Sequence, residues 1–264
     1  MQILALAAMA SSGLSAAASA GSAWDDVQAN VFAGRAIEPA GEIVVLTAPM
    51  RPKDQSHVPI EVAARFTDGR TIRRLTLIVD ENPTPVAAVI EFGQDRDKAR
   101  VATELRLNAA TEVRAVLEAS DGQLYMADRF VKFAGGQASC SAPPQGDPQE
   151  IAANMGKMTF APLRKTAAAT EITPSARVTV NHPNHTGMVM DQLTLLYVPL
   201  RIVSDLEVRQ GSERVFAMKG SMTLSQNPTI EFDYKVNGAE TMHVLAGDSD
   251  GAAWERSFPI GRGS

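Results

Sequence analysis

The sequence predicts an all-β fold of two sandwich domains joined by a flexible linker. Short β-branched or alternating segments recur along most of the 264 residues, and Pro, Gly, Asn and Asp separate them. Their spacing is near the roughly 8–12 residues typical of immunoglobulin-like sandwiches. Residues 135–157, which read GGQASCSAPPQGDPQEIAANMGK, interrupt the pattern without apolar periodicity. The length is sufficient for two domains, each with its own core.

The first twenty residues resemble an export signal. An apolar run from Ile3 to Ala10 precedes small residues that end in Ala18-Ser19-Ala20, which fits an A-x-A cleavage site. The run is shorter than the roughly 20 residues that a membrane span needs. We therefore expect a signal peptide at residues 1–20, an exported mature chain in an oxidising compartment and no membrane insertion after cleavage. The alternative is an ordinary N-terminal helix.

The first predicted domain covers residues 24–134. It begins with a short amphipathic segment in which Trp24, Val27 and Val31 have helical spacing. Period-two patterns then predict about seven strands. These are residues 42–47, 58–66, 72–79, 86–92, 101–107, 112–119 and 123–133.

The second predicted domain covers residues 158–264 and repeats the same organisation. Its strands are predicted at residues 158–163, 176–180, 198–208, 213–218, 229–236, 241–246 and 252–260. The two halves also share turn signals. Asn-Pro precedes a strand at 82–83 and at 227–228, and Ser-Asp-Gly at 120–122 and 249–251 is followed by an aromatic residue at the same offset. The shared order indicates related, duplicated sandwiches.

Composition excludes several functions. The net charge is −5 and no Lys or Arg cluster occurs, so the sequence offers no surface for nucleic acid. No phosphate-binding loop or other cofactor motif appears, and we expect no cofactor.

A metal site is also not expected. The segment Asn181–Gly187 holds two histidines three residues apart, but Pro183 makes it a turn, and zinc needs three or four ligands. We interpret this segment as a structured turn whose imidazoles bond to the backbone or to the other domain. Metal binding is the less favoured alternative.

The single cysteine, Cys140, lies in the linker among small residues. Gly135 and Gly136 predict a hinge before it, and Pro143 and Pro144 a stiffer stretch after it. We expect an arm that projects an exposed thiol; the alternative is a buried, inert cysteine. Nothing ionised lies between Lys132 and Asp147, so the local sequence supplies no group to activate the thiol. This favours a carrier over a catalytic nucleophile.

With these residues in view, the chain resembles the SoxY and SoxZ subunits of a sulfur-oxidising carrier complex joined end to end, as in the fused SoxYZ-like carriers associated with quinoprotein dehydrogenases. The resemblance covers nearly the whole mature chain. The SoxY-like segments are 46–49, 58–60, 80–85, 121–125 and 131–132, and the SoxZ-like segments are 181–183, 186–187, Asp191, 225–228 and 248–251.

The resemblance implies immunoglobulin-like sandwiches, a periplasmic location and covalent attachment of thiosulfate-type intermediates to Cys140. It implies a carrier that partner enzymes load and unload, with no catalytic residue of its own. The partners would be sulfur-oxidation enzymes, or quinoprotein dehydrogenase and cytochrome c enzymes. Related SoxY subunits carry the cysteine in a free glycine-flanked tail, whereas here it is internal. The alternative is a non-covalent assembly module for such a dehydrogenase or cytochrome, with the cysteine incidental.

Overall fold

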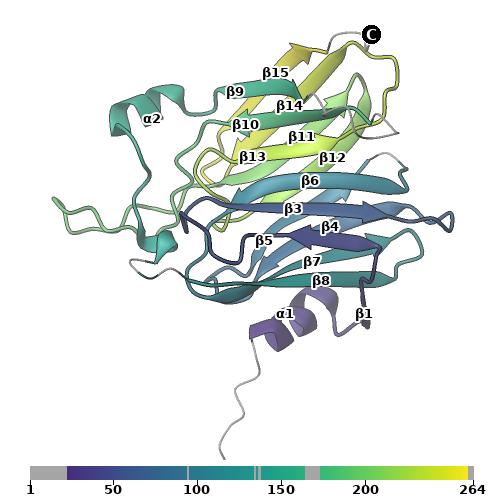
Figure 1. Cartoon of the computed structure of the whole chain (residues 1–264). Helices are drawn as coiled ribbons and strands as arrows, with labels where there is room; N and C mark the ends of the chain where they lie inside the picture. Colours follow the sequence, from purple (N-terminus) through teal and green to yellow (C-terminus); the bar gives the residue numbers. More distant parts are fainter. Residues whose placement is uncertain (1–22, 94, 134, 136–137, 164–172, 261–264) are drawn as a thin grey trace, which may run out of the picture.

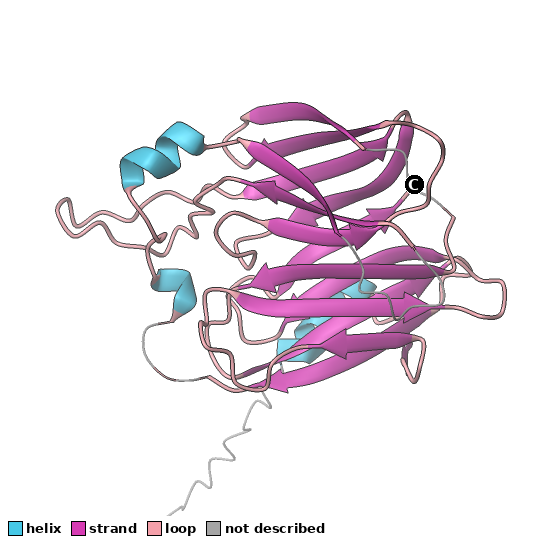
Figure 2. Ribbon diagram, turned by 45° about the horizontal axis from the view of Figure 1, so that its top comes forward, coloured by secondary structure: helices cyan, strands magenta, loops and turns pink. Residues whose placement is uncertain are grey.

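The computed structural model describes residues 23–93, 95–133, 135, 138–163 and 173–260. The predicted signal peptide, residues 1–20, and Gly136 of the predicted hinge lie outside these residues. The described part contains fifteen strands and three short helical segments. Figure 2 shows how strands make up the body of the molecule, with the helices at its periphery.

The strands agree closely with the sequence pattern. The elements of the first half are α1 (Ala23–Phe32), β1 (Ile37–Pro39), β2 (Val44–Thr47), β3 (Val58–Arg65), β4 (Ile72–Val79), β5 (Val86–Phe92), β6 (Lys98–Leu105), β7 (Thr111–Ala119) and β8 (Leu124–Val131). The linker holds a 3-10 helix, η1 (Ser139–Ser141), and α2 (Pro148–Asn154). The second half has β9 (Met158–Leu163), β10 (Ser175–Val180), β11 (Val203–Gln210), β12 (Glu213–Gly220), β13 (Thr229–Asp233), β14 (Thr241–Asp248) and β15 (Ala253–Pro259).

Every predicted strand overlaps an observed one, which confirms the all-β prediction. Two differences have local causes. The short β1 was not predicted, because its three residues carry no alternation; it pairs in parallel with β8. The strand expected to start at residue 198 starts at Val203, since the preceding residues form isolated bridges such as Met190–Tyr197 and His185–Arg201.

The two halves share their sheets, a feature that the sequence does not predict. One sheet has the order β1-β8-β7-β4-β5-β12-β11-β14-β15, and the other has the order β2-β3-β6-β13-β10-β9. Each therefore crosses from the first half to the second, through the antiparallel pairs β5–β12 and β6–β13. Figure 1 shows the strands of the two halves adjoining, with β6 next to β13. This pairing covers strand edges that separate domains would expose.

A single apolar core lies between the two sheets and spans both halves. Buried members include Ile90 and Leu105 from the first half and Phe232 from the second. The rings of Phe216 and Phe232 meet edge to face with centroids 5.0 Å apart. The alternating burial of strands such as β3 and β10 places one face of each strand in this core.

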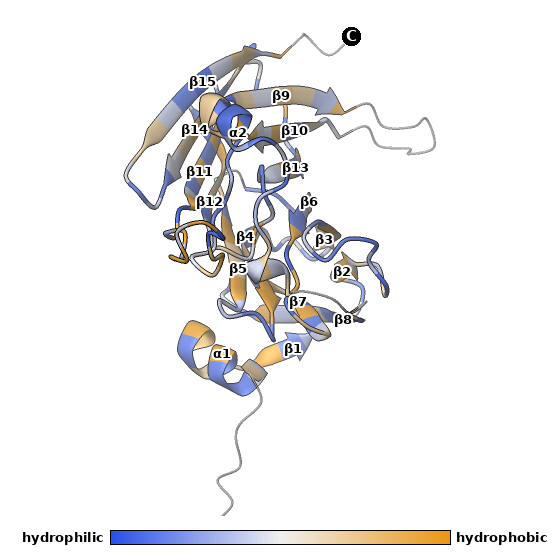
Figure 3. Cartoon of the chain, turned by 90° about the vertical axis from the view of Figure 1, so that its left-hand side faces the viewer, coloured by the Kyte–Doolittle hydropathy of each residue, from blue (hydrophilic) through white to orange (hydrophobic). Residues whose placement is uncertain are grey.

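Helix α1 covers the outer face of the nine-stranded sheet. Val27 and Phe32 of the helix are buried with Val116 and Leu124 of the sheet in a small second cluster. The helical segment predicted at the start of the first domain is thereby confirmed. Figure 3 shows α1 at the opposite end of the molecule from α2.

The linker is folded against the body of the molecule, so the prediction of a projecting arm is wrong. Asp147 caps α2, because its side chain accepts a hydrogen bond of 2.7 Å from the Gln149 N–H, and Pro148 occupies the first helical position. Upstream, the Gln145 N–H donates to Gln226 Oε1 at 2.7 Å, and Gln226 Nε2 donates to the Gln145 carbonyl at 2.9 Å. These contacts attach the linker to the second half.

Candidate carrier site at Cys140

Cys140 is fully buried, which corrects the prediction of an exposed thiol. Its exposed fraction is 0%, and it packs with Ile202 and Met222 of the second half and with the partly buried Met188. The local sequence around Cys140 has no bulky residues, and this led to the expectation of exposure. The apolar contacts come instead from residues more than forty positions away in the sequence.

The segment that carries Cys140 is held by polar contacts from both halves. Ser139 Oγ donates to the Leu107 carbonyl at 2.8 Å, and the Cys140 N–H donates to Asn108 Oδ1 at 3.3 Å. From the second half, the Thr186 hydroxyl donates to the Cys140 carbonyl. The short 3-10 turn is therefore clamped between two loops at the boundary of the two halves.

Arg106 is the charged residue whose electrostatic field acts on the Cys140 thiol. Its side chain is buried, with 4% exposure of the residue. Its guanidinium donates to backbone carbonyls of the second half, at 2.6 Å to Asn184 and at 3.4 Å to Pro183. Burial lowers the pKa of Arg106 to about 10, against the opposing effect of Cys140. The guanidinium still remains charged at neutral pH.

The electrostatics keep the thiol of Cys140 protonated in this conformation. Burial raises the pKa of Cys140, and this outweighs the opposing influence of the Arg106 charge and of a hydrogen bond from Ser139. A buried, protonated thiol is a poor nucleophile. The sequence could not reveal Arg106, because thirty-three positions separate the two residues.

The histidine turn lies next to this site. Its backbone is held by Asn184, a buried residue with a φ of 52°, whose N–H donates to His182 Nδ1 at 3.0 Å. The same asparagine accepts from the Val203 N–H at 2.9 Å and donates to the Leu224 carbonyl at 2.8 Å. The prediction that an imidazole of this turn bonds to the backbone is confirmed for His182.

Both imidazoles of the turn are neutral at pH 7. Burial lowers the pKa of His182 to about 4, although Asp248 lies 3.6 Å from its Nε2 and favours the charged form. The pKa of His185 is also lowered, first by burial and then by the charges of Arg106 and Arg201. His185 Nδ1 is buried and has no hydrogen-bond partner among the described residues.

A pocket of about 670 Å³ opens beside the cysteine segment, between the linker and the loop that follows the histidine turn. Pro143 and Pro144 of the predicted stiffer stretch line it, as do Ser141, Met188 and His185. Its wall is largely apolar. Gly135, the described glycine of the predicted hinge, has a φ of 91°, a backbone conformation that favours glycine. Arm movement about this glycine stays a prediction.

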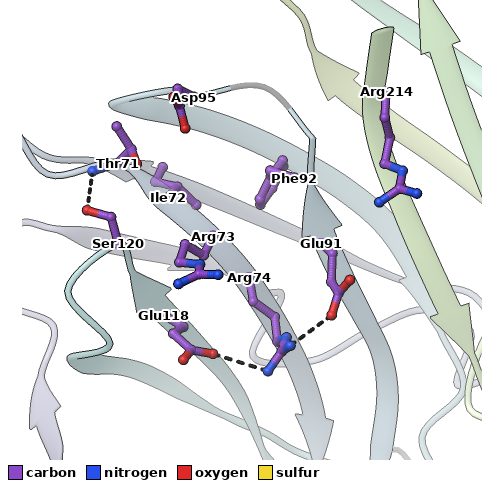
Figure 4. Close-up of a pocket in the computed structure, with 10 residues that line it drawn as sticks. All are labelled: Thr71, Ile72, Arg73, Arg74, Glu91, Phe92, Asp95, Glu118, Ser120 and Arg214. Carbon is purple, nitrogen blue, oxygen red and sulfur yellow. Dashed lines mark hydrogen bonds and ion pairs between the residues drawn. The ribbon is translucent and has the colours of Figure 1, made fainter. Parts of the chain in front are cut away.

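A second pocket, of about 600 Å³, lies on the nine-stranded sheet and is polar. Figure 4 shows Arg74 placed between Glu91 and Glu118, and the ion pairs measure 2.8 and 3.2 Å. Arg74, Glu91 and Glu118 are therefore engaged with one another in this pocket. This pocket lies on an exposed sheet face, and no linker residue lines it. It is therefore separate from the cysteine site.

Within the described residues, no group of three or more His, Cys, Asp and Glu side chains is arranged to hold a metal ion. No helix in the same part of the chain has the length and apolar character needed to cross a membrane. His57 and His243 lie apart from the cysteine site, contacting Asp54 at 3.2 Å and Ser257 at 2.8 Å, respectively.

Comparison with known proteins connects this architecture to sulfur oxidation. Residues 28–137 match the family described as sulfur oxidation protein SoxY, and residues 163–259 match the family described as sulphur oxidation protein SoxZ. No curated protein matches the chain.

Solved structures similar to parts of the chain include two from different organisms. The sulfur carrier protein SoxY from Chlorobium limicola f thiosulfatophilum is 24% identical with a TM-score of 0.37, covering 42% of this chain and 90% of that one. A superoxide reductase (neelaredoxin) from Ignicoccus hospitalis is 16% identical with a TM-score of 0.29, covering 35% of this chain and 82% of that one.

The two family matches together span most of the chain and fall on its two β-sandwich halves. They define a protein of the sulfur-oxidation carrier class, in which both components of a carrier pair occur in one polypeptide. The chain belongs to the SoxYZ-like family as a fused carrier, with the SoxY domain first and the SoxZ domain second.

Proposed function

We propose that this chain is a periplasmic covalent carrier that holds a sulfur-containing intermediate on Cys140 while partner enzymes act on it. The observation that carries the proposal is the placement of the only cysteine at the boundary between a SoxY domain and a SoxZ domain. The loops that clamp it come from both domains, so a partner enzyme that binds either domain can affect the position of the cysteine segment.

The buried thiol implies that loading requires the cysteine segment to open. The hydrogen bonds that hold residues 139–145 include one each with Leu107, Asn108 and Thr186 and two with Gln226. Opening is a local unfolding event that breaks these bonds and removes Cys140 from its contacts with Ile202 and Met222. A partner that binds the opened segment shifts the equilibrium towards it. In the closed state the thiol is protected from unwanted oxidation.

For a thiosulfate cargo, the loading step is an oxidation. The thiol sulfur of Cys140 bonds to the outer sulfur of thiosulfate, giving Cys–S–S–SO₃⁻, and one proton and two electrons are released. The electrons pass to a haem enzyme or cytochrome c of the partner system, so the carrier itself needs no cofactor. Hydrolysis or thiol exchange by another partner then removes the cargo.

The test is loading followed by intact-mass measurement. The purified protein is incubated with thiosulfate, an oxidant and cognate periplasmic extract. We expect a reducible mass increase for wild type and for Ala142→Ser, a matched change two residues away, but none for Cys140→Ser. The absence of a thiol-dependent adduct under every loading condition contradicts the proposal.

A non-covalent assembly module is the second candidate, and one observation favours it. The loop between β10 and β11 exposes large apolar side chains, among them Leu193 at 94% and Leu196 at 69%. In Figure 1 this loop, drawn in green, extends beyond the ends of the strands. Exposed apolar groups of this kind mark contact surfaces. Growth complementation separates the two candidates, because full function of Cys140→Ser favours assembly over covalent carriage.

A further inference from the structure

The pocket beside the cysteine segment has the size and lining of a small-molecule site. Its volume of about 670 Å³ falls in the range of sites for small ligands, roughly 300–1,000 Å³. Apolar side chains contribute most of its wall. They include Pro144, Ile151, Ala152, Met155, Met188 and Met190.

Two residues connect the pocket to the thiol. Ser141, the residue after Cys140, lines the pocket. Met188 lines it as well, and also packs against the buried cluster that contains Cys140. Methionine has an unbranched, flexible side chain that adapts to irregular spaces. The pocket therefore borders the cysteine segment at Ser141 and the buried cluster of Cys140 at Met188, and access of the Cys140 sulfur to the pocket requires movement of η1 and of the Met188 side chain.

The ionised side chains on the pocket wall favour a neutral group over an anion, whereas the charge of the buried Arg106 acts from outside the wall on Cys140 and His185. Among the lining residues, all of which are described, Asp191 is the only one that is ionised at pH 7, and none is Lys or Arg. Hydrogen bonds from Thr194 and Leu193 lower the pKa of Asp191 and keep it charged. His185 is neutral, and its buried Nδ1 offers one unused hydrogen-bonding position. The combination suits a neutral, largely apolar group with one polar atom.

We propose that this pocket holds the organic part of an organosulfur cargo, a neutral aliphatic group whose sulfur joins Cys140 in a mixed disulfide. The inference rests on the proposed carrier function and names its cargo class. The Cys140 thiolate attacks one sulfur of a dialkyl disulfide, a new S–S bond forms and the old one breaks. The other half leaves as a thiol and takes the proton that Cys140 gave up, so no oxidant is consumed.

The first test compares reaction rates of Cys140 with diethyl, dipropyl and dibutyl disulfide and with the disulfide of 2-mercaptoethanesulfonate. Intact mass follows the mixed disulfide. The same rates for the chain unfolded in guanidinium correct for the intrinsic reactivity of each reagent. After correction, we expect the native rate to rise up to about fourfold per buried CH₂, with the sulfonated reagent slowest.

The second test uses a matched pair of variants on α2. Ala152→Phe places a ring in the pocket, whereas Ala153→Phe changes the neighbouring exposed residue, which does not line it. We expect Ala152→Phe to lower the corrected rate for dibutyl disulfide at least about tenfold and to leave the sulfonated reagent unaffected. Ala153→Phe should leave both rates unchanged, which shows that a bulky residue on α2 is tolerated.

A third measurement requires no reaction at the thiol. Dibutyl sulfide is titrated into Cys140→Ser while the methyl NMR signals of the methionines are recorded. We expect shifts confined to pocket methionines such as Met155 and Met188, and no shift when ethanesulfonate replaces the sulfide.

The outcomes separate the two proposals. Equal corrected rates for neutral and sulfonated reagents, or an equal effect of Ala152→Phe and Ala153→Phe, overturn the organosulfur cargo and leave covalent carriage intact. Failure of Cys140 to form any adduct, with these reagents or with thiosulfate and partner extract, overturns the carrier function itself. A methionine NMR response to a partner protein alone identifies the pocket as a protein-contact surface and likewise overturns the cargo assignment.

Discussion

At the scale of single residues, buried polar groups near Cys140 determine its chemistry. Asp248 is held charged by the 2.7 Å hydrogen bond from Arg201 Nε, together with backbone N–H groups at positions 250 and 252. Although burial acts to raise the pKa of Asp248, these hydrogen bonds keep it below its usual range. The buried His182 beside it stays neutral. The histidine turn that contacts the cysteine segment is therefore sensitive to acid.

His182 gives a pH dependence of stability with a defined sign. Its pKa in the fold is about 4, against 6.5 in the unfolded chain, so the unfolded state binds more protons between these values. The free energy of unfolding is then complete above pH 6.5 and falls as the pH drops towards 4, by about 3 kcal/mol from this residue. Urea unfolding at a series of pH values measures the effect.

The matched controls are His182→Asn and His243→Asn. An asparagine at position 182 can still accept the hydrogen bond from the residue two positions on, but it does not titrate. We expect His182→Asn to lose most of the dependence of the unfolding free energy on pH, the remainder coming from His185. His243→Asn should retain the full dependence. An unchanged slope in His182→Asn would show that the imidazole is charged in the fold.

At the scale of elements, the linker joins the second half through a close contact at the end of α2. Gly156 has a φ of 78°, and a Cβ added there would lie 2.1 Å from the Trp254 ring. The same tryptophan meets the His182 ring at 6.1 Å between centroids. The approach of α2 to β15 therefore fixes one end of the linker next to the histidine turn.

Gly156→Ala should destabilise the protein more than Gly238→Ala. Both glycines have a positive φ, 78° and 85°, so both alanines incur backbone strain of about 1 kcal/mol. Only position 156 adds a clash, worth about 1–3 kcal/mol more, because nothing lies within 4 Å of a Cβ at position 238. Guanidinium unfolding compares the two, and equal losses would show that Trp254 moves aside freely.

The elements also show how far the sequence predicts the structure. Period-two alternation identified the strands, because one face of each is buried and the other is not. The Asp-Gly turns were predictable because this dipeptide favours a positive φ at the glycine. Gly122 and Gly251 adopt φ values of 87° and 86°. The burial of Cys140 was not predictable, since the residues that cover it, such as Ile202 and Met222, are distant in sequence. The same distance concealed Arg106.

At the scale of the whole molecule, the shared sheets make one unit of the two domains. Strand pairing across the boundary aligns Phe216 with Phe92 and Phe232 with Val101. No local pattern encodes such pairing, because an edge strand and a central strand can have the same alternation. The sequence therefore predicted two sandwiches correctly but not their continuity.

This continuity predicts cooperative unfolding. Because one core and two sheets span both halves, neither half can unfold without exposing apolar surface of the other. We expect a single calorimetric transition whose van't Hoff and calorimetric enthalpies agree. Two separable transitions, each assigned to one half by limited proteolysis, would contradict a shared core.

Covalent carriage is tested most directly by the chemical state of Cys140 in the cell. The measurement is the intact mass of the protein isolated under non-reducing conditions from cells that oxidise sulfur compounds, with Cys140→Ser and Ala142→Ser isolated in parallel. A mass increase that a reductant removes, present in wild type and Ala142→Ser and absent in Cys140→Ser, is the predicted result. An unmodified Cys140 in every growth condition, with Cys140→Ser supporting normal growth, would contradict the account.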